Sequence, residues 1–205
     1  MPKVVDHEQR RARLVEAVWA LAIQSGLEGV TLRRVAAEAG VSMGQVQHYY
    51  PSMRELVRDA LDRAVRALNA KIEASIGAVG AASPEVVLRE CLHAVIALDD
   101  ESVRLTRFAL AVLGRTMSDP AMTPVLAPGD DELLAFTAGL ITAARSERGS
   151  PLRGGERMDA DISWSVATSL GVDIAIGHRS AEAARSLLDH HIERLLGPRR
   201  GEETG

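Results

Sequence analysis

The segment SMGQVQHYYPS, residues 42–52, predicts a short helix with a defined start and a defined end. Ser42 is followed three residues later by Gln45, a capping-box pattern in which each side chain satisfies a backbone donor at the helix start. Pro51 disfavours helical geometry at the residue before it, so the helix should end near Tyr50. A helix of about two turns is too short to be stable alone, and we therefore expect tertiary packing to hold it.

The residues before this segment complete a helix-turn-helix pattern. From Glu8 to Gln24 apolar residues recur every three or four positions, which predicts a long amphipathic helix. Thr31 can then cap a second helix, which should end at Gly40. A supporting helix, a capped second helix, a tight turn and a further short helix are together typical of a helix-turn-helix unit.

A long helix follows directly, because Ser52 and Glu55 repeat the capping pattern. Its apolar positions continue from Met53 to Ile76, and this length suggests a connector to the rest of the chain. The small-residue stretch from Gly77 to Ser83 is the best candidate for a loop between two functional halves.

Five more helical patterns make up the remainder. We expect helices at residues 84–98, 101–117, 130–148, 159–178 and 180–196, followed by a short, polar, disordered tail. The predicted fold is all-α, with a three-helix helix-turn-helix domain at residues 1–52 and a connector helix with a helical C-terminal domain at residues 53–205.

The composition agrees with this class. The chain has 205 residues, of which 46% are hydrophobic and only 3% aromatic, so its core must consist mostly of helix-favouring aliphatic side chains. A lone cysteine, Cys91, excludes an internal disulfide, and we see no leader pattern, so we expect a cytoplasmic protein. The longest apolar run, residues 162–177, is interrupted by Asp173 and falls short of the roughly 18 to 20 residues that a membrane span needs.

The charge is unevenly distributed. The net charge is −4, which alone argues against a nucleic-acid partner. Residues 1–54 nevertheless carry seven basic and five acidic side chains, against 17 basic and 23 acidic ones in the remainder. The N-terminal unit is therefore modestly basic relative to an acidic body.

Residues near the start of the second helix of a helix-turn-helix reach base edges in the major groove. Gln45 and Gln47 can each donate and accept in a bidentate contact to adenine, and Met43 can pack against a thymine methyl group. His48 and Tyr49 suit backbone phosphates. The alternative is that these polar side chains merely cover a solvent face. The residues expected to face inward are Val46 and Tyr50.

The electrostatic attraction to DNA must come from the flanks, because no Lys or Arg lies between Arg34 and Arg54. For the arginines on the first helix, a simple solvated helix face is an equally good interpretation. The candidate residues are Arg10, Arg11, Arg13, Arg33, Arg34 and Arg54.

Several short motifs resemble a known family in both order and spacing. GVTLRRVA at residues 29–36, AGVSMG at 39–44, HYYPS at 48–52 and EL at 55–56 resemble the DNA-binding domain of the tetracycline-repressor (TetR) family. The match runs through most of residues 10–60. The C-terminal half resembles the family more weakly, through LGR at 113–115, SDP at 118–120 and HHIERLL at 190–196, which are similar to a common actinobacterial type and to the betaine-regulator branch.

This resemblance implies an all-helical homodimer with a three-helix DNA-binding domain, a connecting fourth helix and a larger ligand-binding and dimerisation domain. Matched position by position, the base-contacting residues are Arg33, Met43, Gln45 and Gln47. The backbone-contacting residues are Thr31, Leu32, His48 and Tyr49.

Two positions depart from the family pattern. Met53 stands where the family usually has a phosphate-binding lysine, and Arg54 is the candidate to replace it. Gln47 stands where the family often has an aromatic residue, which implies a different base preference.

The last two predicted helices should pair with their copies in a second chain to form a four-helix bundle. The alternative is that they form the internal core of a monomer. A two-fold dimer suits a palindromic operator, which favours the first interpretation. The expected interface residues are Ile162, Val166, Leu170, Ile174, Ala184, Leu187, Leu188, His191 and Leu195.

Polar residues within apolar helices, together with two phenylalanines, indicate an effector pocket. Each has an ordinary structural interpretation as well: a satisfied core histidine for His93, a hydrogen bond across the dimer for Asp173, and solvent exposure for the arginines. The pocket candidates are Cys91, His93, Arg104, Arg107, Phe108, Phe136, Trp164 and Asp173.

Catalytic and metal-binding motifs are not found in the sequence. It contains no H-E-x-x-H pattern, cysteine pair, glycine-rich phosphate loop or nucleophile elbow. His190 and His191 are adjacent and would point about 100° apart on a helix, so they are a poor pair of ligands for one ion. We expect no enzyme activity, no metal and no cofactor.

These features together predict a ligand-responsive transcriptional regulator. It should act as a repressor that binds double-stranded DNA at a palindromic operator as a homodimer and is released by a small-molecule effector, without a membrane partner. One alternative is a similar regulator without a small-molecule ligand, acting as an activator or controlled by a protein. The other is a helical binding protein or enzyme with a vestigial helix-turn-helix.

Overall fold

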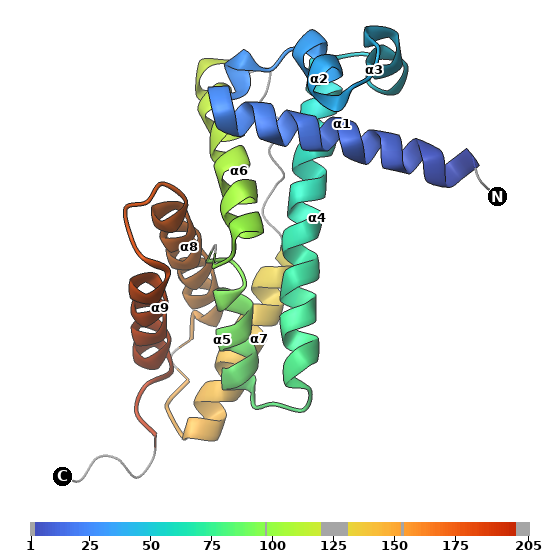
Figure 1. Cartoon of the computed structure of the whole chain (residues 1–205). Coiled ribbons are helices and arrows are strands. Elements are labelled where there is room, and N and C mark those ends of the chain that lie inside the picture. The colour runs from blue at the N-terminus through green and yellow to red at the C-terminus, as the bar shows by residue number, and fades with distance from the viewer. Residues whose placement is uncertain (1–2, 97, 120–130, 153, 200–205) are drawn as a thin grey trace. The chain divides into compact units, whose positions relative to one another are not determined.

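The computed structural model describes residues 3–96, 98–119, 131–152 and 154–199, and every regular element in these ranges is helical (Figure 1). The predicted all-α class is therefore confirmed. The elements are α1 (Lys3–Ser25), the short 3-10 helix η1 (Leu27–Gly29), α2 (Leu32–Ala39), α3 (Met43–Tyr49), α4 (Met53–Val79), α5 (Pro84–His93), α6 (Asp100–Ser118), α7 (Asp131–Arg148), α8 (Glu156–Ala175) and α9 (Ala181–Leu196).

The chain forms two compact units. One comprises residues 1–67 and 104–128, and the other comprises residues 68–103 and 129–205. Helices α4 and α6 each contribute residues to both units, so the chain passes between them inside continuous helices. The predicted boundary after Ser52 separates the DNA-binding part of the chain from the remainder by function. The two compact units do not test it, so it stays a prediction.

The first unit is built on the apolar stripe of α1. Its buried residues pack with those of α2, α3, α4 and α6 in a single core. Trp19 is anchored there, because its indole Nε1 donates to the carbonyl oxygen of Ala60 at 3.2 Å and its ring lies 6.2 Å from that of Phe108. The first helix therefore supports the helix-turn-helix as expected, because it shares one core with α2, α3, α4 and α6.

The second unit packs α5, α7, α8 and α9 around a separate aliphatic core. Fully buried members include Leu88 and Leu92 of α5, Ile141 of α7, and Leu188 and Ile192 of α9. Within the described residues, no helix combines the length and apolar character needed to cross a membrane.

Two buried arginines on α7 tie this second unit together. Arg145 is 3% exposed and donates to the carbonyl oxygen of Leu195 at 2.9 and 3.1 Å and to Asp159 at 2.8 Å. Arg148 is 6% exposed and donates to both carboxylate oxygens of Glu85, at 2.6 and 2.9 Å, and to Glu193 at 2.9 Å. The two guanidinium groups thereby link α7 with α5, α8 and α9.

Several predicted helix boundaries are wrong. The expected loop from Gly77 is shorter, because α4 continues through Gly77 to Val79 and the chain turns at Gly80, where φ is 57°. Helix α5 ends at His93 rather than at residue 98. The described residues that follow, up to Asp99, are not helical, and Asp99 accepts a hydrogen bond from the Ser102 N–H and caps α6.

Of the last three helices, α8 is displaced from its predicted range, whereas α9 covers Ala181–Leu196 as expected and α7 ends at Arg148 as expected. Helix α8 covers Glu156–Ala175 instead of 159–178, with left-handed glycines outside each end, Gly155 and Gly177. The expected start of α7 at residue 130 and the end of the polar tail, residues 200–205, lie outside the described residues.

The Arg148 cluster supports a stability prediction. Replacing Arg148 by Met should lower the free energy of unfolding by about 2 to 3 kcal/mol near pH 7, because Glu85 and Glu193 would lose the most buried of their partners and keep Arg89. The matched control is Arg157→Met, which removes an exposed ion pair with Asp131 and should cost less than about 1 kcal/mol. Urea unfolding of both variants measures the difference.

The stability difference between wild type and Arg148→Met should depend on pH, and the sign of this dependence follows from the pKa shifts of the two glutamates. The Arg148 guanidinium lowers the pKa of the Glu85 and Glu193 carboxyl groups below 4.5, so their contribution is present above that pH and is lost as pH falls further. The stability gap between wild type and Arg148→Met should therefore narrow on acidification from pH 6 to pH 3. A gap that is constant over this range would contradict the assignment.

Candidate DNA-recognition surface and effector cavity

The turn between α2 and α3 is built as the sequence predicts. The Thr31 hydroxyl oxygen accepts a hydrogen bond from the Arg34 N–H at 3.2 Å and caps α2. Gly40 ends that helix in the left-handed conformation, with φ of 66°, and the N–H of Val41 donates to the carbonyl oxygen of Ala36 at 2.9 Å. Only Val41 and Ser42 separate Gly40 from the first residue of α3, Met43. Figure 1 shows the close succession of α2 and α3.

The predicted capping box at the start of α3 is present in both directions. The Gln45 N–H donates to the Ser42 hydroxyl at 3.2 Å, and the Ser42 N–H donates to the Gln45 side-chain oxygen at 3.1 Å. The Gln45 carboxamide oxygen is therefore already engaged in holding the helix. Gln47 is exposed and its side chain forms no hydrogen bond with any residue that the structure describes, so both ends of its carboxamide are available.

Helix α3 turns its apolar residues inward, as predicted. Val46 is fully buried and Tyr50, which ends the helix, is 3% exposed. Met43, at 38% exposure, lies on the outer side with Gln47 and His48, both of which are also exposed. The side chains expected to contact bases are therefore accessible to a partner.

Tyr49 is linked to the N-terminal part of α1. Its hydroxyl lies 2.9 Å from Nδ1 of His7, and its ring packs edge-on against His7 and His48. Beside it is a groove of about 300 Å³, lined among others by Arg10 and Arg13. Sequence reasoning did not identify His7, because nothing near it in the chain indicates a partner 42 residues away.

The flanking arginines have different roles. Arg34 donates to the Gly29 carbonyl oxygen at 2.6 Å and to the Ser25 hydroxyl at 3.1 Å, so it holds the turn before α2. Arg11 lies over the Tyr50 ring, 5.6 Å from its centroid. Arg33 and Arg54 are exposed and form no ion pair in the described part of the chain, which leaves their charges available for a polyanion.

Two other positions named from the sequence pack against the protein. Leu32 and Met53 are partly buried against the core of the first unit. Met53 thus has a packing role at the position where a lysine was expected.

A polar network that sequence reasoning missed holds the end of α3. The Tyr50 hydroxyl donates to the Asp59 carboxylate, which also accepts from Nε of Arg63 at 3.2 Å. Arg63 in turn pairs with Glu8 of α1, with Nη1 2.7 Å from Oε1. Burial and the Asp59 hydrogen bond raise the pKa of Tyr50, so its hydroxyl stays a donor at neutral pH. Helices α1, α3 and α4 are joined through this network.

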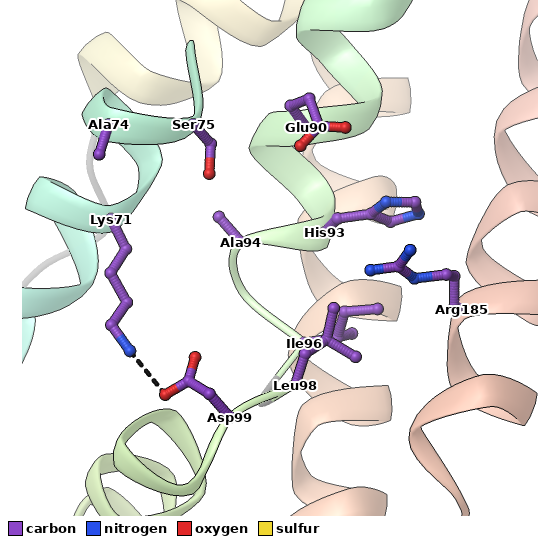
Figure 2. A pocket seen from close by; sticks show the side chains of 10 residues that line it. All are labelled: Lys71, Ala74, Ser75, Glu90, His93, Ala94, Ile96, Leu98, Asp99 and Arg185. Atoms are coloured by element: carbon purple, nitrogen blue, oxygen red, sulfur yellow. Dashed lines mark hydrogen bonds and ion pairs between the residues drawn. The ribbon is translucent and has the colours of Figure 1, made fainter. Parts of the chain in front are cut away.

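The second unit contains an open cavity of about 420 Å³ (Figure 2). Its wall combines residues of α4, α5, α9 and the segment before α6. Of the eight pocket candidates from the sequence, only His93 lines it. The His93 Nε2 lies 2.9 Å from an Asp189 carboxylate oxygen, and burial lowers the pKa of His93. The residues lining the cavity are Lys71, Ala74, Ser75, Glu90, His93, Ala94, Ile96, Leu98, Asp99 and Arg185.

Three of the remaining candidates belong to the first unit. Phe108 is fully buried in the core with Trp19. Arg104 pairs with Glu16 and lies 5.1 Å from the centroid of the Trp19 ring. Arg107 is exposed. None of the three lines the cavity of the second unit.

The other four candidates belong to the second unit. Cys91 is fully buried, which raises its pKa to about 11. Trp164 donates to the Thr137 hydroxyl at 3.0 Å, and Phe136 is 45% exposed. Asp173 accepts from His178 and Arg179, both at 3.1 Å, and so closes the end of α8 within its own chain.

The residues predicted for a dimer interface divide into three groups by exposure. Ala184 and Leu188 are fully buried in the core of their own chain, and Leu170 is 7% exposed. Ile162 and Leu187 are 48% and 44% exposed and remain available to a partner. Val166, Ile174, His191 and Leu195 are half-buried.

Exposed apolar side chains extend this surface beyond the predicted residues. Met158 and Ile176, also on or next to α8, are 70% and 62% exposed. His191 is partly committed within its own chain, since its Nε2 lies 2.9 Å from the Ser163 hydroxyl.

The Tyr50 network can be tested with adjacent tyrosines. Tyr50→Phe should lower the free energy of unfolding by about 1 to 2 kcal/mol, because the half-buried Asp59 carboxylate loses a donor. Tyr49→Phe is the matched control and should change stability by less than about 0.5 kcal/mol, since its partner His7 is exposed. Thermal unfolding of the two variants compares them, and equal losses would argue against the network.

Comparison with known proteins identifies the N-terminal unit. Residues 14–60 match the family model described as "Bacterial regulatory proteins, tetR family". The HTH-type transcriptional regulator BetI of Paraburkholderia phymatum is 34% identical over 130 residues. That alignment covers 60% of this chain and 62% of the relative, so the chain spans less than two thirds of it.

Solved structures share the fold over nearly the whole chain. A putative TetR-family transcriptional regulator from Rhodococcus sp. superposes with a TM-score of 0.79 at 22% identity, covering 92% of this chain and all of the other. A putative transcriptional regulator from Saccharomonospora viridis, in complex with choline, gives a TM-score of 0.74 at 18% identity over 90% of this chain and 96% of the other. The matched proteins are transcriptional regulators rather than enzymes. The capped helix-turn-helix of the first unit therefore lies in a stretch that matches the tetR family of bacterial regulatory proteins, and nearly the whole chain shares the fold of the solved putative regulators.

Proposed function

We propose that this chain is a ligand-responsive repressor that binds a palindromic operator as a homodimer in the cytoplasm. The observation that carries the proposal is the outward position of Gln47 on a capped helix, with both the oxygen and the N–H₂ of its carboxamide available. Arg33 and Arg54 are exposed and form no ion pair with any described residue. Such an arrangement suits base contacts supported by contacts to the phosphates.

The DNA contacts follow from the exposed side chains. Gln47 is the principal base reader, whereas Gln45 offers mainly its amide N–H₂, because its oxygen is engaged in the capping box. The proposed base-contacting set is Arg33, Met43, Gln45 and Gln47. The proposed backbone-contacting set is Thr31, Leu32, His48, Tyr49 and Arg54.

The effector would act by shifting a population. A small molecule that binds better to the arrangement with separated recognition helices would draw the dimer away from the DNA-competent one. The cavity in the second unit supports this interpretation over a regulator without a ligand. The exposed apolar residues Ile162 and Leu187 are the proposed centre of the dimer surface, and α4 is the proposed lever.

The choline complex of the S. viridis protein does not transfer directly to this chain. Quaternary ammonium groups are usually held by aromatic rings. No Phe, Tyr or Trp side chain is found among the described residues that line the cavity. Its wall therefore favours a ligand that forms hydrogen bonds and ion pairs.

Gln47→Ala tests base recognition. On an operator recovered from a random-sequence pool, the variant should lose about 1 to 3 kcal/mol of binding free energy, together with discrimination at one position of each half-site. Fluorescence anisotropy with wild-type and single-position variant duplexes measures both effects. Unchanged affinity and unchanged discrimination would support the vestigial alternative.

Arg54→Ala tests the phosphate contact. Its loss should weaken binding to all DNA sequences to a similar extent and reduce the slope of log affinity against log salt by about 1 per recognition unit. Arg194→Ala on α9 is the matched control, because it removes an exposed arginine from the second unit. A salt slope that stays the same in Arg54→Ala would show that this residue does not replace the missing lysine.

A further inference from the structure

Two charged side chains in the cavity are unmatched, although other charges there are paired. The Lys71 ammonium donates to Asp99 and to the Ser102 hydroxyl, both at 2.8 Å, and lies 3.2 Å from Glu101. These four residues satisfy one another. In contrast, Glu90 and Arg185 have no ion pair or side-chain hydrogen bond with any described residue, although both line the cavity.

The unmatched charges have opposite sign and come from different helices. Glu90 belongs to α5 and is half-buried, whereas Arg185 belongs to α9 and is exposed. Figure 2 shows the Arg185 guanidinium extending toward His93, with the Glu90 carboxylate on the other side of that ring. The Nε2 atom of His93 is not available as a hydrogen-bond partner for Glu90 or Arg185, since it is already paired with Asp189.

Four of the ten residues that line the cavity are apolar. Ala74, Ala94, Ile96 and Leu98 contribute to the wall. A half-buried carboxylate beside apolar groups gains from a partner that replaces its lost hydration. A ligand with a positive and a negative end, joined by a short aliphatic chain, would match both charges and the apolar surface.

We propose that the cavity binds a small dipolar metabolite of the amino-acid type, with its carboxylate at Arg185 and a primary ammonium at Glu90. This inference rests on the proposed ligand-responsive function and specifies its effector class. An arginine and a carboxylate form charge-assisted hydrogen bonds, often in a bidentate arrangement. A primary ammonium donates three hydrogen bonds, which suits the Glu90 carboxylate, whereas a quaternary ammonium donates none.

The position of Arg185 provides a path to the proposed dimer helix. Arg185 and Asp189 are four residues apart on α9 and so lie on the same side of it. Asp189 binds both His93 and Arg89 of α5. A ligand that engages Arg185 therefore acts on the α9 surface that is already attached to α5.

Calorimetric titration of the full-length protein tests the ligand class. The probes are glycine, 3-aminopropanoate, 4-aminobutanoate, 5-aminopentanoate and 6-aminohexanoate, which vary the distance between the charges. Three analogues of the probe that binds most tightly serve as comparison compounds. One keeps only the carboxylate, one keeps only the ammonium, and one carries a trimethylated nitrogen in place of the primary ammonium. We expect the dipolar compound to bind at least about 10-fold more tightly than each of these analogues.

Variants assign the two ends of the ligand. Arg185→Gln and Glu90→Gln should each weaken the dipolar probe at least about 10-fold. Arg185→Gln should leave the affinity of the ammonium-only analogue unchanged, because that compound lacks the group that Arg185 binds. Arg194→Gln and Glu182→Gln replace exposed α9 residues outside the cavity and should change nothing. Circular dichroism and unfolding midpoints verify that each variant is folded.

Three outcomes would overturn the proposal: no binding by any dipolar probe, equal binding of the singly charged analogues, or unchanged affinity in both cavity variants. Operator binding by the same preparations is measured without probe. If the protein binds its operator specifically but none of the dipolar probes binds in the calorimetry, the effector class alone is rejected. Absence of sequence-specific DNA binding would reject the proposed function, whatever the calorimetry gives.

Discussion

The seven residues of α3 cannot maintain a helix by themselves, so the recognition surface depends on how the two ends of this helix are tied. At its start, Ser42 and Gln45 exchange hydrogen bonds. At its end, Tyr50 is buried and donates to Asp59, which Arg63 holds in place. With both ends tied and Val46 in the core, Met43 and Gln47 can only face outward.

Some arginine and glutamine side chains of this protein stabilise the fold, whereas others of the same type remain exposed and uncommitted. Arg34 holds a turn and Arg148 joins three helices from a buried position, whereas Arg33 and Arg54 remain uncommitted. A carboxamide behaves similarly, since the Gln45 oxygen stabilises the helix that presents Gln47. The overall negative charge therefore says little about DNA binding, because many basic groups are neutralised internally and a few are not.

Local patterns were predictable and distant pairings were not. The caps at Thr31, Ser42 and Ser52 depend on residues three positions away, so the sequence alone identifies them. The pairing of Arg148 with Glu193 joins residues 45 positions apart and has no local pattern. For the same reason most pocket candidates lie elsewhere: a polar residue within an apolar helix indicates a partner, but not whether that partner is a ligand or another helix.

Selection of bound duplexes from a random-sequence pool tests most directly whether two copies of α3 read a symmetric DNA site. We expect enrichment of a sequence with two inverted half-sites. Their centres should lie one helical turn apart, about 34 to 36 Å, or a multiple of it. Recovery of sequences without inverted symmetry, or of none enriched above the starting pool, would contradict the account.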